Sequence, residues 1–333
     1  MNWVLVGAST IASQYMIGAI RAQSGKIVRV VSNSAARAAE FAAGHGIPGA
    51  TANLAEALAD PEVTAVYISS TNEKHAAQAL AAIAAGKHVL CEKPLAMSLD
   101  EAAGMVRAAR DAGVVLATNH HLRCSASHRA IRDLIASGRI GRVLSLRIFH
   151  AVHLPASLQG WRINDAGAGG GVIPDITVHD ADVARFLLAE DPQDVVAQTG
   201  ASGMGQGVED SAMSVWTMPS GAMVMSHESF THPFAGTGLE VHGTDGSILA
   251  RGVMTQEPVG EIELVTGSGR EAVPFDAHNL YEYGVGRFVA AVAGNGQPAA
   301  TGGDGVKSLA VAHAVRKAAL TGQRQTVDYG DIE

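Results

Sequence analysis

The first 118 residues alternate between short apolar runs and segments with a helical pattern, and this alternation constrains the fold more than any other feature. The expected strands lie at 3–6, 26–31, 50–51, 65–69, 88–91 and 114–118. Helices are expected between them, ending at Arg21 and then at 35–44, 53–59, 75–85 and 99–112. Repeated strand–turn–helix units predict an α/β fold with a doubly wound parallel sheet of the Rossmann type.

The pattern changes after residue 120. The expected elements are a helix at 125–137, a strand at 143–153, a helix at 174–188, several strands within 195–273, and helices at 279–293 and 304–320. A run of strands joined by turns predicts a large, mostly antiparallel open sheet, backed by the two helices before it. We therefore expect a dinucleotide-binding domain at 1–120 and a substrate-binding and catalytic α+β domain at 121–333.

Composition and charge narrow the class of protein. The formal net charge is −8 and no basic run is present, so nucleic acid is not expected as a partner. Two cysteines, Cys91 and Cys124, are too few for a disulfide framework. The sequence shows no signal peptide and no apolar run of membrane-spanning length. We expect a cytoplasmic protein without a membrane association.

The segment Gly7–Ala12 stands where a dinucleotide-binding fingerprint is expected, directly after the first strand. Gly7 supplies the tight turn, Ser9 replaces the second glycine and Ala12 the third. The backbone amides that follow, including those of Thr10 and Ile11, would meet the pyrophosphate at the helix N-terminus. The degenerate motif is weak evidence alone, but its place in a βαβ unit favours a cofactor site.

The end of the second strand favours NADP(H) over NAD(H). NAD enzymes usually carry an acidic residue there, which binds the ribose hydroxyls. Here the strand is followed by Ser32, Asn33 and Ser34, and Arg37 could reach back as a cation. Neutral donors and a guanidinium suit a 2′-phosphate, which a carboxylate would repel. The alternatives are that Arg37 is an ordinary exposed helix residue and that NAD(H) is used.

The residues after the fourth strand have two interpretations. Thr71 and Asn72 could contact the ribose or nicotinamide of the cofactor, but both residue types also cap helices well. His75 could contribute to the same site or lie solvated in the first turn of a helix. The sequence does not decide between these alternatives.

A second candidate site residue lies in the segment Gly86–Met97. The strand at 88–91 stops at Glu92, Lys93 and Pro94, and Pro94 prevents a direct continuation into a helix. A lysine at the end of a parallel strand points to the crevice where such sheets bind ligands. We therefore include Glu92 and Lys93 among the cofactor-binding candidates and Lys93 among the catalytic ones. An ordinary surface lysine is the alternative, and a cis bond before Pro94 would fix the direction of Lys93.

Asp175 and His179 are four positions apart on the helix expected from Pro174. They would lie one above the other on one helix face, where the carboxylate can orient the imidazole and favour its protonated form. Such a group can give a proton to an alkoxide as hydride arrives. The alternative is an ordinary surface pair. No third metal ligand is apparent beside them, and no metal is expected.

These motifs together resemble the Gfo/Idh/MocA family of oxidoreductases. The resemblance spans the whole sequence and rests on the Gly-rich first turn, Thr71-Asn72-x-x-His75, the segment 85–96 with Glu-Lys-Pro, and Gly169-Gly-Gly-x-x-x-Asp175-x-x-x-His179. Within the family, stretches such as 119–123, 149–152 and 240–243 resemble bacterial reductases of a sugar ketone. The resemblance implies NADPH-dependent reduction of the C2 ketone of 1,5-anhydro-D-fructose to 1,5-anhydro-D-mannitol.

The resemblance also implies roles for individual residues. Ser9, Ala12, Ser32 and Arg37 would shape the NADP site, and Lys93, Asp175 and His179 would form the catalytic group. Residues near the sugar would be His150, Gln159, Trp161 and Arg162, with Asp175 and His179. Alternative functions are an NAD-dependent sugar or inositol dehydrogenase and a non-catalytic NADP-sensing regulator. The sequence leaves open a monomer or a homo-oligomer formed through the C-terminal sheet.

Overall fold

A computed structural model describes residues 1–330 of the protein. The chain divides into two compact units. The N-terminal unit contains Met1–His120 and Tyr281–Val306, with Gly330 at the end of the described residues. The C-terminal unit contains His121–Leu280 and Lys307–Tyr329.

The division near residue 120 coincides with the domain boundary expected from the sequence, but one later segment differs from that expectation. Residues 281–306, expected in the second domain, cluster with the N-terminal unit. Aromatic packing accounts for this, because the ring of Phe288 lies 5.3 Å from that of Trp3 and Tyr281 stacks on Tyr15 at 4.7 Å.

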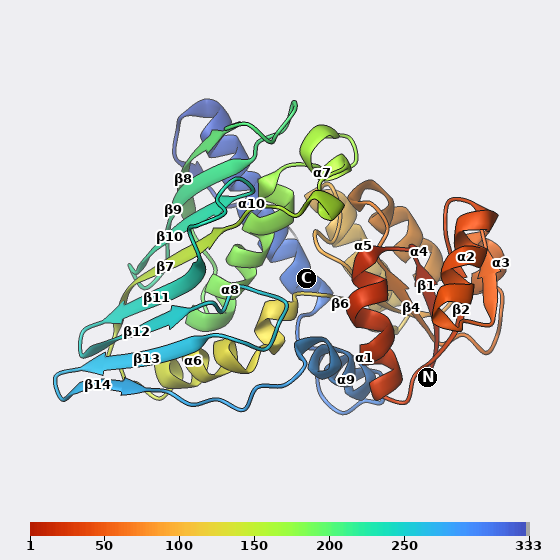
Figure 1. Ribbon diagram of the computed structural model, residues 1–333, viewed down its shortest axis with the longest axis horizontal. Helices are drawn as coiled ribbons and strands as arrows, with labels where there is room; N and C mark the ends of the chain where they lie inside the picture. The colour runs from red at the N-terminus through yellow and green to blue at the C-terminus, as the bar shows by residue number, and fades with distance from the viewer. Residues whose placement is uncertain (331–333) are drawn as a thin grey trace. The chain divides into compact units, whose positions relative to one another are not determined.

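The N-terminal unit is built on a six-stranded parallel sheet in the order β3-β2-β1-β4-β5-β6, which confirms the Rossmann prediction (Figure 1). Its strands are β1 (Asn2–Val6), β2 (Lys26–Val31), β3 (Gly49–Thr51), β4 (Ala65–Ile68), β5 (His88–Cys91) and β6 (Leu116–Thr118). The central strands β4 and β5 are almost wholly buried, as continuous apolar runs require in a sheet covered on both faces.

Short, alanine-rich helices connect and cover these strands. They are η1 (Ala12–Met16), α1 (Ile17–Ala22), α2 (Ala35–His45), α3 (Leu54–Leu58), η2 (Asn72–Lys74), α4 (His75–Ala84), α5 (Leu99–Asp111) and α9 (Leu280–Val292). A capping box begins α5, since the Ser98 side chain accepts from the Glu101 amide and the Glu101 side chain accepts from the Ser98 amide. The strand order reverses between β1 and β4, and a doubly wound sheet binds ligands at the carboxyl ends of the strands beside such a point.

The C-terminal unit contains a nine-stranded sheet in the order β14-β13-β12-β11-β7-β10-β9-β8-β15. Its strands are β7 (Val143–Ala151), β8 (Asp194–Gly200), β9 (Ser211–Thr217), β10 (Met223–Ser229), β11 (Thr237–Gly243), β12 (Gly246–Arg251), β13 (Glu261–Thr266), β14 (Gly269–Ala272) and β15 (Gln325–Thr326). All neighbours pair antiparallel except β7 and β10, so the predicted mostly antiparallel sheet is confirmed.

Helices pack on one face of this sheet, and the other face is open (Figure 1). The helices of the unit are η3 (His121–Cys124), α6 (Ala126–Ala136), η4 (Ala156–Leu158), α7 (Trp161–Asn164), η5 (Ile173–Thr177), α8 (Val178–Leu188) and most of α10 (Gly302–Thr321). Along β9, Ala212, Ser214 and Trp216 are buried, whereas Met213 and Val215 are exposed. The exposed positions lie on the open face, and an oligomer formed through it stays a prediction.

The loop between β8 and β9 is organised by the buried carboxylate of Asp210. Its oxygens accept from the amides of Ser202, Gly203, Met204 and Gly205 and from the Ser202 hydroxyl, at 2.7–3.1 Å. Burial alone would raise the pKa of Asp210, but these hydrogen bonds lower it to about 2.

We predict that Asp210→Asn lowers the free energy of unfolding by about 2–3 kcal/mol at neutral pH, because one amide oxygen cannot accept from all these donors. The native pKa lies below that of the unfolded chain, so this stabilisation is full above about pH 4 and is lost as the pH falls towards 2. Chemical unfolding between pH 2 and 7 checks this. Equal losses for Asp245→Asn, a surface control, would contradict the assignment.

Candidate active site

The turn after β1 brings two strand ends into close contact. Gly7 has φ 117°, and a Cβ there would lie 2.7 Å from the carbonyl carbon of Ser69, so only glycine fits. The Ser9 hydroxyl lies 2.7 Å from that of Ser69 and accepts from the Ala12 amide at 3.2 Å. Ser69 directly follows β4, so this contact joins the two sides of the point at which the strand order reverses.

The helix that follows begins with a π-helical turn, η1, which the sequence did not predict. Ala12 is fully buried, as expected of a residue that packs helix against strand, whereas Thr10 is exposed and Ile11 half-buried. A glycine turn followed by a helix N-terminus presents backbone amides at the end of β1. This donor set suits the pyrophosphate of a dinucleotide.

Arg37 reaches back from α2 to this turn, where its Nη2 donates to the carbonyl of Ala8 at 2.9 Å. Ser34 is the N-cap of α2 and accepts from the Arg37 amide, so its hydroxyl serves the helix. Ser32 and Asn33 follow β2, with the Ser32 hydroxyl 3.4 Å from Oδ1 of Asn33. A guanidinium therefore lies beside the glycine turn.

The residues after β4 take different positions. Thr71 precedes η2 and its hydroxyl donates to Glu73 at 2.7 Å, while Asn72 is buried. His75 is fully buried, with Nδ1 2.8 Å from the carbonyl oxygen of Pro94 and Nε2 3.1 Å from that of Ser70. The solvated alternative for His75 is therefore wrong. It ties the end of β4 to the turn after β5.

The end of β5 carries a buried acid followed by a partly exposed lysine. Glu92 is 8% exposed, and its Oε1 accepts from the Tyr67 hydroxyl and from Asn119 Nδ2, both at 2.6 Å. Burial raises the pKa of Glu92 despite these two donors. Through these two hydrogen bonds, Glu92 connects the end of β5 to Tyr67 on β4 and to Asn119 after β6. Lys93 is half-buried, and its bond to Pro94 is cis.

In the C-terminal unit, three glycines lead into the helix that carries Asp175 and His179. A Cβ at Gly170 would lie 2.5 Å from the Trp161 carbonyl oxygen, and one at Gly171 would lie 2.5 Å from Oε1 of Glu209. Gly170 thus allows the chain to pack closely on residues 161–165, and Gly171 allows it to approach Glu209 in the loop before β9. The first turn, η5, is π-helical, and α8 begins only at Val178. The expected continuous helix from Pro174 is therefore correct in extent but wrong in its first turn.

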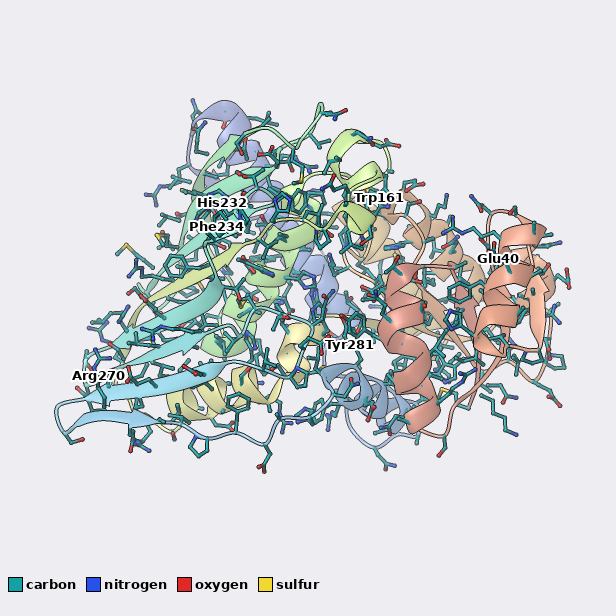
Figure 2. The ribbon with its side chains drawn as sticks, viewed as in Figure 1. Glu40, Trp161, His232, Phe234, Arg270 and Tyr281 are labelled. Atoms are coloured by element: carbon teal, nitrogen blue, oxygen red, sulfur yellow. The ribbon has the colours of Figure 1, made fainter. Side chains whose placement is uncertain are left out.

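Side chains around Asp175 come from the loop with α7. The Asp175 carboxylate lies 3.5 Å from Nε of Arg162, whose guanidinium carbon lies 4.7 Å from the centre of the Trp161 ring. Figure 2 marks Trp161 on this loop. Gln159 Nε2 donates to the Leu154 carbonyl at 3.0 Å. Arg162 and Trp161 are thus brought near Asp175, whereas the Gln159 amide binds its own loop.

His179 lies among other histidines. Its ring meets that of His121 edge-on with centres 4.7 Å apart, and the His150 ring is 6.4 Å away. His150 lies on β7, and its Nδ1 is 2.7 Å from Oδ1 of Asp180. The structure therefore brings His150 and His179 together, as two of the residues expected near the sugar.

The sequence analysis missed Asp180, Ser226 and Glu228, which continue from His150 into the core. A signal was present, because Val224, Ser226 and Glu228 alternate along β10 on its buried face. A serine and a glutamate at such positions indicate a buried polar network.

Among residues 1–330, no group of three or more His, Cys, Asp or Glu side chains is placed to hold a metal ion. Both cysteines are buried, and neither forms a disulfide bond within the described residues. Within the same range, no helix is long and apolar enough to cross a membrane.

Two family models match this chain. Residues 1–120 match the oxidoreductase family with an NAD-binding Rossmann fold, and residues 128–249 match the C-terminal domain of GFO/IDH/MocA proteins. The chain belongs to the Gfo/Idh/MocA family of oxidoreductases. The family assignment confirms an enzyme that uses a nicotinamide dinucleotide and disfavours the non-catalytic regulator.

Two named relatives match over almost their whole length. A 1,5-anhydro-D-fructose reductase from Ensifer adhaerens is 55% identical over 99% of both chains. A D-xylose 1-dehydrogenase (NADP(+)) from Haloferax volcanii is 30% identical over 98% of this chain and 100% of its own.

Solved structures share the fold at lower identity. A levoglucosan dehydrogenase in complex with NADH and L-sorbose has a TM-score of 0.89 at 22% identity, over 99% of both chains. An aldose–aldose oxidoreductase from Caulobacter crescentus has a TM-score of 0.89 at 23% identity, over 98% of this chain and 99% of that one.

We predict that His75→Ala lowers kcat about tenfold, because the Pro94 and Ser70 carbonyls lose the imidazole between them and the turn carrying Lys93 loosens. Steady-state kinetics with NADPH check this. Lys74→Ala is the matched control, since Lys74 is an exposed neighbour that pairs with Glu73 on the surface. Unchanged kcat in His75→Ala would contradict a positioning role.

Proposed function

We propose that this protein reduces the C2 ketone of 1,5-anhydro-D-fructose to 1,5-anhydro-D-mannitol with NADPH. The observation that carries the proposal is the reductase relative at 55% identity over 99% of both chains. The strand-end residues of the N-terminal unit and the histidine cluster of the C-terminal unit provide the polar groups that such a reduction needs. The D-xylose dehydrogenase relative supports a second candidate, a sugar dehydrogenase working towards oxidation.

The cofactor would be held by the carboxyl ends of β1, β2, β4 and β5. The amides after Gly7, with Ser9, Thr10, Ile11 and Ala12, suit the pyrophosphate, and Ser32, Asn33 and Arg37 suit a 2′-phosphate. No acidic residue follows β2 before Glu40. The residues that would lie towards the nicotinamide are Thr71, Asn72, Glu92 and Lys93. We propose that His75 holds the turns after β4 and β5 in place around this group.

The catalytic proposal assigns one role to each of three residues. NADPH would supply the hydride to the carbonyl carbon. The Lys93 ammonium donates a hydrogen bond to the carbonyl oxygen and stabilises the negative charge that develops there. His179 gives that oxygen its proton, and Asp175 orients the imidazole. The roles of Lys93 and His179 as final proton donor are open to exchange.

The sugar hydroxyls would be bound by His150, Gln159, Trp161 and Arg162, with Asp175 and His179. Nε of Arg162 lies 3.5 Å from the Asp175 carboxylate, so these two side chains are close enough to bind neighbouring hydroxyls of one sugar. The cytoplasmic location and the oligomeric state stay predictions from the sequence.

The decisive assay follows consumption of NADPH and of NADH against 1,5-anhydro-D-fructose and a panel of ketoses, osones and inososes. We expect the highest kcat/KM for 1,5-anhydro-D-fructose with NADPH. A higher value for oxidation of an aldose or inositol with NAD⁺ would favour the dehydrogenase instead.

We predict that Arg37→Ala raises KM for NADPH about tenfold or more and leaves KM for NADH within about twofold, because only NADPH carries the phosphate. Arg29→Ala is the control, since Arg29 pairs with Glu56 on the surface. An unchanged KM for NADPH in Arg37→Ala would contradict the proposal that Arg37 binds the 2′-phosphate.

We predict that Lys93→Ala and His179→Ala each lower kcat by about 10² or more, as expected for groups that stabilise the developing negative charge or transfer the proton. Single-turnover measurements at saturating NADPH check the chemical step. Lys74→Ala again serves as the lysine control. Near-normal turnover in either variant would contradict the role given to that residue.

A further inference from the structure

A buried chain of polar groups runs from β7 through α8 to β10 within the C-terminal unit. His150 Nδ1 lies 2.7 Å from Asp180 Oδ1, and Asp180 Oδ2 lies 3.3 Å from the Ser226 hydroxyl. The same hydroxyl lies 2.5 Å from Oε1 of Glu228. Asp180, Ser226 and Glu228 are all 0% exposed. The catalytic proposal above uses neither carboxyl group.

The serine between the two carboxyl groups limits their charge. A serine hydroxyl has one proton to donate, so it cannot donate to Asp180 and Glu228 at once. Both contacts become hydrogen bonds when one carboxyl group is protonated and donates to Ser226, which then donates to the other. The shorter contact is with Glu228, and short O···O distances accompany bonds between a hydroxyl and an acid.

A second observation places the proton on Glu228. Its Oε2 is buried and has no hydrogen-bond partner among residues 1–330. An ionised carboxylate with an unsatisfied buried oxygen is costly, whereas a neutral acid tolerates it. Burial first and the Asp180 charge second raise the pKa of Glu228 well above its usual range. Asp180, in contrast, is satisfied by His150 and Ser226.

The groups that face His150 are consistent with a single negative charge at Asp180. Glu228 is its neighbour in the register of β7 and β10, and His179 lies beside it on α8. His128, on α6, is fully buried, and burial lowers its pKa to about 3, so it is neutral. On β11 the buried side chains beside β7 are the apolar Leu239 and Val241. His227 also lies near Asp180, and burial lowers its pKa.

We propose that Asp180 and Glu228 share one proton, and that this pair holds His150 with its Nδ1–H on Asp180 and its Nε2 directed to the sugar. Glu228 and Asp180 are then positioning residues for a substrate-binding histidine. The inference rests on the proposed function only in taking a sugar as the ligand of His150. The protonation of the pair is a property of the free protein.

The first experiment observes the proton directly, without substrate. The protein is labelled with ¹³C at the side-chain carboxyl of glutamate, and its NMR spectrum is recorded at pH 7. We expect a signal at the position of a protonated carboxyl that Glu228→Gln removes. Glu92→Gln is the matched control, because Glu92 is also buried but accepts two donors. Persistence of every protonated-carboxyl signal in Glu228→Gln would overturn the shared proton.

The second experiment observes the tautomer of His150 by ¹⁵N-histidine NMR, with His150→Gln used to assign its signals. Asp180→Asn should weaken the preference for the Nδ1–H tautomer, because an amide can donate to Nδ1 as well as accept from it. Glu228→Gln should leave the tautomer unchanged, because the amide is also neutral and can donate to Ser226. An equal change of tautomer in both variants would mean that a charge on Glu228 also acts on the imidazole, which would overturn the proposal.

The third readout links the pair to the sugar. Asp180→Asn should raise KM for 1,5-anhydro-D-fructose about tenfold with a smaller change in kcat, because a carboxylate no longer holds the imidazole that binds the sugar. A fall in kcat at constant KM would overturn the binding role of His150. Absence of reductase activity in the wild-type protein would reject the proposed function, while the two NMR experiments would still test the shared proton.

Discussion

The cofactor side of the structure depends on the close approach of two backbone turns at Gly7 and Ser69. A side chain at residue 7 would overlap the Ser69 backbone, so the strand ends of β1 and β4 can meet only because residue 7 is glycine. That contact allows the Ser9 and Ser69 hydroxyls to pair and directs the following helix with its amides at the strand ends. The arrangement of the amides that we propose for phosphate binding is therefore a consequence of backbone packing.

The same constraint recurs in the C-terminal unit, where Gly170 and Gly171 pack against the 161–165 loop and Glu209. In both units a glycine-dependent contact is followed by a π-helical turn, η1 or η5, before a regular helix. The wider turn changes which side chains share a helix face, so four-residue spacing alone does not establish that Asp175 and His179 lie above one another. In both units, close packing at a glycine thus precedes an irregular first turn of the helix.

The sequence predicted what depends on local pattern. The alternation of apolar runs with helical patterns identified the Rossmann strands and helices, and the Glu-Lys-Pro segment located the end of β5. It could not predict that 281–306 packs with the N-terminal unit, because the Trp3–Phe288 and Tyr15–Tyr281 contacts join residues far apart in the chain. Nor could it predict the setting of His75, whose two carbonyl neighbours come from different strand ends. The roles of the individual site residues stay predictions.

The network behind His150 escaped prediction for a related reason. Glu228 becomes its neighbour only through the parallel register of β7 and β10, the single parallel pair in that sheet. Asp180 and Glu228 would repel one another if both were ionised. Protonation of Glu228 removes this repulsion and leaves the charge of Asp180 to hold the imidazole of His150. A glutamate in the core then acts without any contact with a ligand, because its neutrality determines the charge that His150 encounters.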